Sequence, residues 1–172
     1  MFMAFVGALR TCGATVPLTW VLGSPLTTMW PFKRKSSTQL KSSEHQPDAE
    51  ASRLVVEMAK AFISAMQAAS GNWQKAFYRL EVSDALHSSS GSFVTPSDVH
   101  VMDAFTFDTL FEKLEPLALE LGERTKPKEK PFCILLLSIN CDFDYTIDFE
   151  WVDQDRWRIS KMDGGTGIPE GK

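Results

Sequence analysis

The residues best suited to chemistry are six carboxylates that stand within 14 positions near the end of the chain, with no basic residue between them. Several of them alternate with aromatic and aliphatic side chains, which predicts a strand with one acidic face and one apolar face. Paired aspartates of this kind bind Mg²⁺ or Ca²⁺ when they converge on one point. A strand instead spaces its residues by about 3.3 Å, so the carboxylates form a row rather than a cage. These residues are Asp142, Asp144, Asp148, Glu150, Asp153 and Asp155.

Three interpretations of this acidic row remain open. It can hold the metal of a metal-dependent hydrolase, or it can be the solvated face of a regulatory or scaffold module, where charge discourages edge aggregation. It can also pair with Lys and Arg on a basic protein, because complementary charge speeds encounter and selects the partner. Proteins that grip nucleic acid are basic where they do so, and an acidic row can block that groove. We favour such a partner surface, with Phe77 as an exposed aromatic anchor.

No other group of residues predicts catalysis. Nothing in the sequence ties any of the three histidines to Cys133 or Cys141 as a nucleophile and its base. The run Gly164-Gly165-Thr166-Gly167 is not followed by Lys and a helix, so it is not a phosphate loop. No Cys and His spacing suits zinc. We therefore expect a protein that is not an enzyme, with no catalytic residue, no cofactor and no metal.

The charge of the chain is unevenly placed. Residues 1–47 carry five bases and one acid, whereas residues 48–172 carry 13 bases and 21 acids. This asymmetry is typical of a tail joined to a domain. No apolar run reaches the roughly 18–20 residues of a membrane span, and three cysteines are too few for a disulfide framework. We expect a cytoplasmic protein with reduced thiols.

Four segments follow from this distribution. Residues 1–28 resemble no working signal or anchor, and we expect a non-structural segment or a start assigned too early, with Met29 as the true start. Residues 29–49 are predicted to be a basic, polar and flexible linker. Residues 50–163 are expected to form one domain. Residues 164–172 are expected to be a loose, Gly-rich tail.

The domain is predicted to contain two helices and five to six strands. Apolar residues at three-and-four spacing predict helices over residues 50–70 and 107–121, the second bent or divided by Pro116 and ended by Gly122. A turn is expected over Ser88–Gly91. Strands are predicted over residues 73–83, 92–95, 99–105, 132–139, 142–151 and, as a short last strand, 156–162.

The order of these elements indicates the fold class. It reads α-β-β-β-α-β-β, and short turns between successive strands favour antiparallel pairing. Two amphipathic helices must bury their apolar stripes against something. The expected architecture is an α+β domain, in which both helices pack against an antiparallel sheet of five to six strands.

Three stretches of this domain together resemble a known family. They are the strand Ala76–Val82 after Trp73, the helix Phe107–Leu114, and the acidic and aromatic ending Tyr145–Asp153. With this element order, residues from about 50 to 155 resemble the YezG-like immunity proteins, the antitoxins of polymorphic bacterial toxins. The chain departs from that pattern in its long N-terminal part, in Asn140-Cys141-Asp142 where the family's turn contains Gly, and in the extension over residues 156–167.

The resemblance implies a function. It implies a cytoplasmic protein that binds a cognate toxin, often a nuclease, and neutralises it without catalysis. The partner is then a toxin with a basic surface, and neither a nucleic acid nor a membrane is bound directly. This agrees with the separate expectation, drawn from the residues, that no catalytic group is present.

Overall fold

A computed structural model describes residues 5–7, 49–84, 86–125 and 131–172 of the chain. The predicted linker, apart from Ala49, and most of the predicted N-terminal segment lie outside these residues. The helices are α1 (Ala49–Ala69) and α2 (Asp108–Thr125). The strands are β1 (Phe5–Gly7), β2 (Lys75–Val82), β3 (His87–Val94), β4 (Val99–Val101), β5 (Ile134–Asn140) and β6 (Tyr145–Glu150).

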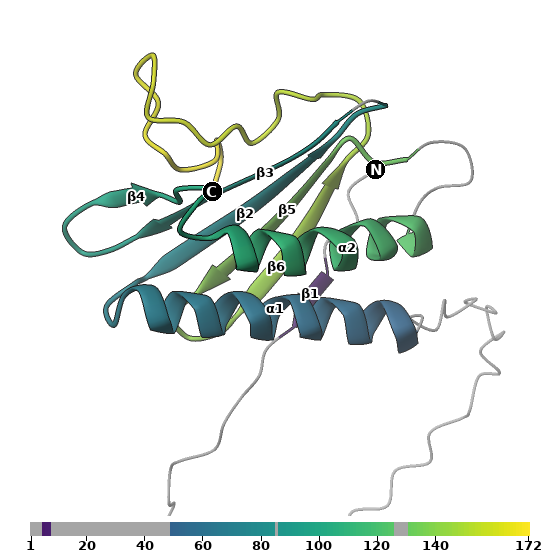
Figure 1. Cartoon of the computed structure of the whole chain (residues 1–172), viewed down its shortest axis with the longest axis horizontal. Coiled ribbons are helices and arrows are strands. Elements are labelled where there is room, and N and C mark those ends of the chain that lie inside the picture. Colours follow the sequence, from purple (N-terminus) through teal and green to yellow (C-terminus); the bar gives the residue numbers. More distant parts are fainter. Residues whose placement is uncertain (1–4, 8–48, 85, 126–130) are drawn as a thin grey trace, which may run out of the picture. The chain divides into compact units, whose positions relative to one another are not determined.

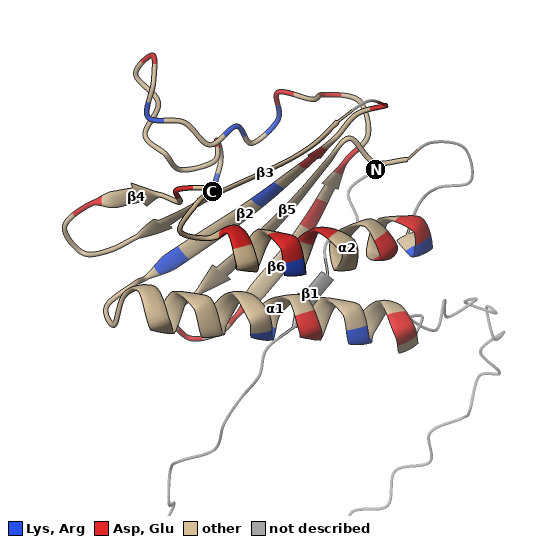
Figure 2. Ribbon diagram, in the orientation of Figure 1, with Lys and Arg blue, Asp and Glu red and all other residues tan. Residues whose placement is uncertain are grey.

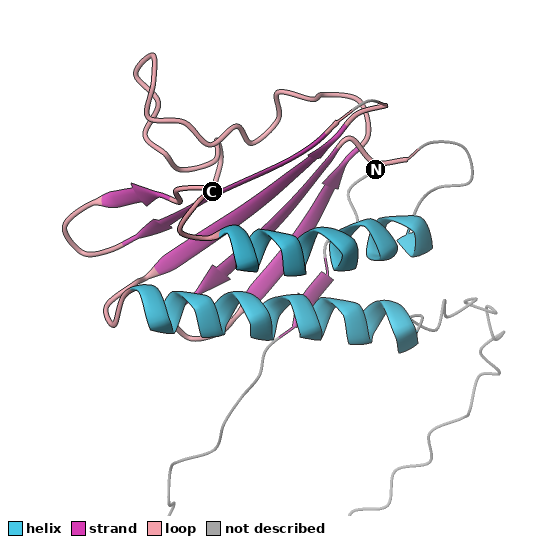
Figure 3. Cartoon of the chain, in the orientation of Figure 1, coloured by secondary structure: helices cyan, strands magenta, loops and turns pink. Residues whose placement is uncertain are grey.

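The strands form one antiparallel sheet in the order β1-β6-β5-β2-β3-β4. Both helices lie on the same side of it (Figures 1 and 3). The predicted α+β class is confirmed, and from residue 49 onward the element order is the predicted one. Chain order and sheet order differ because β5 pairs with β2, which places β5 at the centre of the sheet.

The core lies between the helices and the facing side of the sheet. On α1 the spacing of Leu54, Met58, Phe62 and Met66 places four large side chains on one stripe, and all are buried. They meet alternate residues of the central strands. The ring of Tyr78 on β2, for example, packs edge-on against Phe62 at a centroid distance of 6.4 Å. The apolar residues that recur about every 3.6 positions along the helix therefore pack against those that occupy every second position along the strands.

The sequence predicts that α2 is bent or divided at Pro116 and ends at Gly122, and the structure contradicts the division and the end. The helix runs without division through Pro116, whose ring is exposed, and it continues to Thr125. The expected end at Gly122 is wrong, because this glycine lies inside the helix and is buried. A Cβ atom there would collide with the ring of Phe132. Glycine is therefore needed at this position because Phe132, just before β5, packs closely against α2. It does not end the helix.

Two strand predictions are also wrong. The expected turn over Ser88–Gly91 is part of β3, which pairs with β2 along its full length from His87 to Val94. Its backbone hydrogen-bonding groups are satisfied by a neighbouring strand, and this outweighs the turn preference of serine and glycine. The expected last strand over 156–162 is absent from the described residues, which follow an irregular path from residue 151 to residue 172.

Strand β1 adds a short edge to the sheet. Phe5–Gly7 pairs antiparallel with Tyr145–Ile147 of β6. Three residues of the segment expected to be non-structural are therefore placed beside β6. The proposed start at Met29 stays a prediction.

Candidate partner-binding surface

The sheet has a second face, on the side away from the helices, and two residues of the acidic row, Asp148 and Glu150, belong to it. Because side chains alternate along a strand, this face is formed by the residues between those that face the core. The burial of β6 alternates as predicted, with its apolar side chains buried and its polar ones half-buried. We use the name second face for the side chains of Phe77, Arg79, Ser92, Ile134, Leu136, Ser138, Thr146, Asp148 and Glu150.

The C-terminal segment, residues 152–172, covers much of this face. Figure 1 shows it away from the two helices, beyond β3 and β4. Its central contact is Trp157, which is 4% exposed and belongs to a cluster with Phe77, Ile134 and Leu136. Trp157 has a positive φ of 56°, which costs a bulky residue about 1–3 kcal/mol. Packing of the indole against the sheet therefore holds the backbone in a conformation that it would otherwise leave.

Arg79 ties the beginning of the segment to the sheet. Its side chain is buried, and its Nε donates to the carbonyl oxygen of Arg156 at 3.0 Å. One Nη donates to the carbonyl oxygen of Gln154, and the other pairs with Glu81 at 2.9 Å. A buried guanidinium needs such partners, since burying an unpaired charge is costly. The arginine thus gives two carbonyl groups of an irregular segment their hydrogen bonds.

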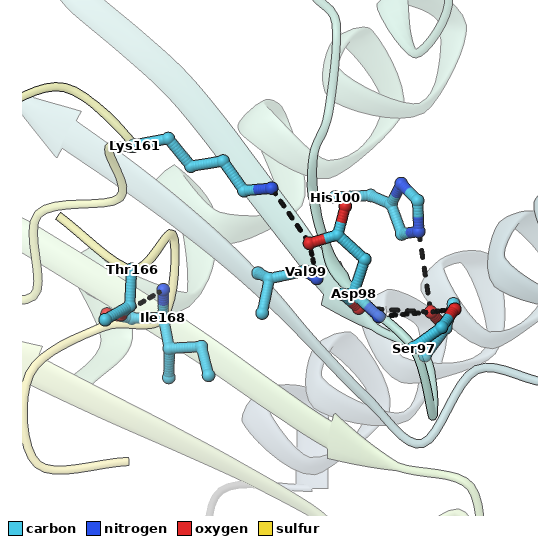
Figure 4. Close-up of polar contacts among 8 residues, drawn as sticks. Ser97, Asp98, Val99, His100, Lys161, Thr166 and Ile168 are labelled. Carbon is cyan, nitrogen blue, oxygen red and sulfur yellow. Dashed lines mark hydrogen bonds and ion pairs between the residues drawn. The ribbon is translucent and has the colours of Figure 1, made fainter.

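Two lysines attach the rest of the segment. Lys161 Nζ lies 3.1 Å from a carboxylate oxygen of Asp98 in the β3–β4 turn. Figure 4 marks this contact with a dashed line. The hydrogen bond from Lys161 and the one from the backbone N–H of Val99 hold the pKa of Asp98 below its ordinary value. Lys172 pairs with Asp148 and lies 5.5 Å from the ring centre of Trp157. Basic groups of the segment are therefore matched to acidic groups of the sheet.

The six predicted carboxylates do not form one surface. Asp148 is occupied by Lys172, and Glu150 accepts hydrogen bonds from the backbone N–H groups of Trp151 (2.9 Å) and Val152 (3.0 Å). Partial burial acts to raise the pKa of Glu150, but these hydrogen bonds outweigh it and lower the pKa. The other four are exposed, and among the described residues none forms an ion pair. They lie as two pairs at opposite ends of β6: Asp142 with Asp144, and Asp153 with Asp155.

The expectation that Phe77 is exposed is wrong. Its side chain is 2% exposed because Trp157 and the residues around it cover it. The alternation along β2 places Phe77 opposite the core-facing Tyr78, as predicted, but the second face is covered where the prediction assumed solvent. Sequence reasoning missed this cover, together with Arg79, Trp157, Lys161 and Lys172. The available signal was the apolar set Trp157, Ile159 and Ile168 in a segment interpreted as a short strand and a tail.

Space remains at one end of the second face. A pocket of about 260 Å³ lies beside Lys172 and is lined in part by Phe77, Ser138 and Thr146. The hydroxyl of Ser138 is buried without a hydrogen-bond partner, and so is that of Ser92, which lies directly across from Phe77 on β3. The C-terminal segment thus covers the apolar side chains of this face but leaves polar atoms unmatched.

No catalytic arrangement is found among the described residues. His87 Nδ1 lies 3.0 Å from Glu115, and His100 stacks on Phe93, so both histidines have structural partners. Burial raises the pKa of the Cys133 thiol, which makes it a poor nucleophile at neutral pH. Within the part of the chain that the structure describes, no three acidic, His or Cys side chains gather closely enough to hold a metal.

Comparisons with known proteins add no family. No family model matches the chain, and no curated protein is significantly similar to it in sequence. Among the described residues, neither helix is long and apolar enough to cross a lipid bilayer. The resemblance to immunity proteins therefore stays a prediction.

Proposed function

We propose that this chain is a non-catalytic immunity protein, which binds a cognate bacterial toxin in the cytoplasm and neutralises it. The observation that carries the proposal is the set of four exposed carboxylates at the two ends of β6, which have no cationic partner among the described residues. Unpaired carboxylates attract a basic protein surface from a distance and favour one orientation of it. A toxin that acts on nucleic acid has such a surface, because it must contact phosphates.

The α2 helix extends the acidic character of the molecule. Figure 2 shows acidic residues along α2 as well as on β6. The helix contains five acids and two bases over Asp108–Thr125. A basic partner would therefore meet a negative field over more than one element, which supports fast association at low ionic strength.

The experiment tests protection and charge together. The chain is expressed with the toxic C-terminal domain encoded by the adjacent gene, and we expect the cells to survive and the two proteins to copurify. Replacing all four exposed carboxylates by Asn, at Asp142, Asp144, Asp153 and Asp155, should slow association about ten-fold or more at low salt, because steering is lost. The fold should persist, since these side chains contribute nothing to the core.

A control removes two exposed carboxylates elsewhere, half the number that the variant removes. Asp84→Asn with Asp163→Asn also neutralises exposed carboxylates, but neither residue belongs to the two pairs at the ends of β6. This control should associate at nearly the parental rate, within the small loss expected from net charge alone. Failure of the parental chain to protect cells would overturn the proposed function, and equal slowing by the control would remove the assignment of the exposed acids.

A further inference from the structure

The C-terminal segment is attached to the second face in a different way from the helices, which pack on the opposite face of the sheet. Among the described residues it forms neither helix nor strand, so no ladder of backbone hydrogen bonds joins it to the sheet. Its own backbone bonds are short-range, such as Gly167 N–H to the carbonyl of Ser160 at 2.9 Å. The contacts with the sheet are made by side chains, chiefly Trp157, Arg79, Lys161 and Lys172.

The contacts of the C-terminal segment show which chemistry the second face accommodates. The C-terminal segment carries four bases and four acids, and all four bases but only two of the acids lie in residues 156–172. This basic part begins with a tryptophan between two arginines, Arg156-Trp157-Arg158. The tryptophan enters the apolar cluster around Phe77, while lysines pair with carboxylates on either side. An aromatic residue buried at the centre with charged contacts at the rim is the arrangement of a protein interface.

Three features indicate that this occupant can be replaced. The backbone at Trp157 has a positive φ, a strain that departure of the segment would relieve. The hydroxyls of Ser92 and Ser138 on the second face are buried and have no hydrogen-bond partner among the protein atoms described. A pocket of about 260 Å³ lies next to Lys172. A segment that fills this space and hydrogen-bonds these hydroxyls would fit the face better than the present one.

We propose that the second face is the surface that receives the partner, and that the C-terminal segment occupies it as an internal mimic of that partner. The occupant that displaces it is a segment of a basic protein, with an aromatic side chain between basic ones. The identity of that protein as a toxin rests on the proposed function, but the binding chemistry of the face does not. The exposed acids at the ends of β6 attract the basic partner, and exchange of one segment for the other follows.

The first experiment supplies the segment in trans. The probe is a fluorescent, acetylated peptide of residues 156–172, and the protein is the full chain carrying Trp157→Ala. In the parental chain the tethered segment competes at an effective concentration of about millimolar. In the variant this competition is weakened, so we expect the peptide to bind at least about ten-fold more tightly than to the parental chain. The same peptide carrying Trp157→Ala should not bind.

The matched control changes the same segment without changing its contacts. Met162 is 77% exposed, so the full chain carrying Met162→Ala should exclude the peptide as the parental chain does. Absence of saturable binding to the Trp157→Ala chain, with its circular dichroism unchanged, would overturn the proposal. Equally tight binding to the parental chain would also overturn it, because the peptide would then occupy another surface.

A second variant guards against loss of folding. If the chain with Trp157→Ala does not fold, the combination of Lys161→Ala and Lys172→Ala keeps the indole and removes both lysine contacts. We expect about three-fold tighter peptide binding than to the parental chain, and raised salt should weaken the binding of the parental peptide to this variant through its remaining charges. No gain in binding by this folded variant would contradict the mimicry.

The oligomeric state of the parental chain gives a further outcome. If the parental chain is a dimer in solution and dissociates when the peptide is added, a second copy of the chain is the occupant, and this also contradicts the mimicry.

Hydrogen exchange in the toxin complex separates this proposal from the proposed function. If the toxin takes the second face, residues 152–172 should lose protection in the complex while α1 and α2 keep theirs. Neutralisation with the segment still protected would overturn the mimicry and leave the proposed function standing. If the peptide binds in trans but the chain neutralises no toxin, the proposed function is overturned and the mimicry stands.

Discussion

The two faces of the sheet are made by alternate residues of the same strands, yet they are covered in different ways. On one face Tyr78, Leu135 and Leu137 are fully buried beneath two helices, whose backbone groups bond within the helices themselves. On the other face an irregular segment lies over Phe77 and Leu136 and depends on Arg79 and on ion pairs. The helix-covered face is a core, whereas the second face has the composition of an interface.

The difference has an energetic consequence. A helix-covered core loses stability whenever a side chain is removed, because cavities there collapse only partly. A segment anchored by side chains opens on its own at a lower free energy than the whole domain. Substitutions on the two faces should therefore differ in how much stability they remove and in how much of the domain they affect. Those on the core face weaken the whole domain, and those on the second face release residues 152–172.

The largest effect is expected on the core face. Phe62→Ala removes a fully buried ring that contacts Tyr78 and should lower the free energy of unfolding by about 3–5 kcal/mol, measured by urea denaturation. Phe105→Ala is the matched control, because Phe105 is 93% exposed, and it should change stability by less than about 0.5 kcal/mol. A small loss for Phe62→Ala would mean that the helices cover the sheet no more firmly than the C-terminal segment does.

The core face was largely predictable from the sequence. Period-two and period-3.6 patterns identified both helices and the alternation on β2 and β6, since burial of one face leaves a local signal. The boundaries were less predictable. Gly122 looks like a helix stop in sequence, and only its contact with Phe132 shows why glycine is needed inside the helix. The serines of β3 form a strand because β2 pairs with them, which no local pattern records.

The second face was predictable only in part. The alternation of acids on β6 was visible, but its cover was not, because an irregular segment has no periodicity. Ion pairs such as Lys172 with Asp148 join residues 24 positions apart and leave no trace in spacing. For the same reason the sequence favoured an exposed Phe77, although Trp157 was present to bury it.

Arg79 tests how the second face is held. Arg79→Met keeps the apolar stem but removes the hydrogen bonds to the carbonyls of Gln154 and Arg156, so we expect a loss of about 2 kcal/mol and faster hydrogen exchange over residues 152–158. Lys75→Met, on the same strand but exposed, is the control and should leave exchange unchanged. If Arg79→Met accelerates exchange equally in α1, the segment is part of the core, and the contrast between the faces is lost.

Tyr78 tests the core face by pH. Burial raises the pKa of this phenol, and the hydrogen bond with Ser89 at 3.0 Å only partly offsets that. A raised pKa in the folded state means that the stabilising contribution is complete below the unfolded value of about 10 and is lost as pH rises above it. The free energy of unfolding should fall by up to about 1.4 kcal/mol per pH unit there. Tyr78→Phe should remove this slope in alkaline urea denaturation; an unchanged slope would show that Tyr78 is not its source.

The smallest effect is expected where β6 passes into the C-terminal segment. The Glu150 carboxylate accepts the N–H groups of Trp151 and Val152 and so fixes the turn from which the segment departs. Glu150→Ala leaves both groups to solvent and should cost about 0.5–1 kcal/mol, while Glu150→Gln keeps an amide oxygen as acceptor and should cost less. Both variants remove the negative charge, and the difference between their free energies of unfolding, measured by urea denaturation, reports the acceptor together with the aliphatic part of the side chain.

The dependence of the free energy of unfolding on pH in the acid range provides a second test of Glu150, and its direction is defined. Because the folded pKa of Glu150 is lowered, its contribution is complete above the unfolded value of about 4.3 and is lost as pH falls below it. Both variants should therefore flatten the acid dependence of stability, although only Glu150→Ala should also speed exchange at Trp151 and Val152. If Glu150→Gln speeds exchange as much as Glu150→Ala does, the negative charge rather than the acceptor geometry fixes the turn, and the segment is held at its origin by electrostatics alone.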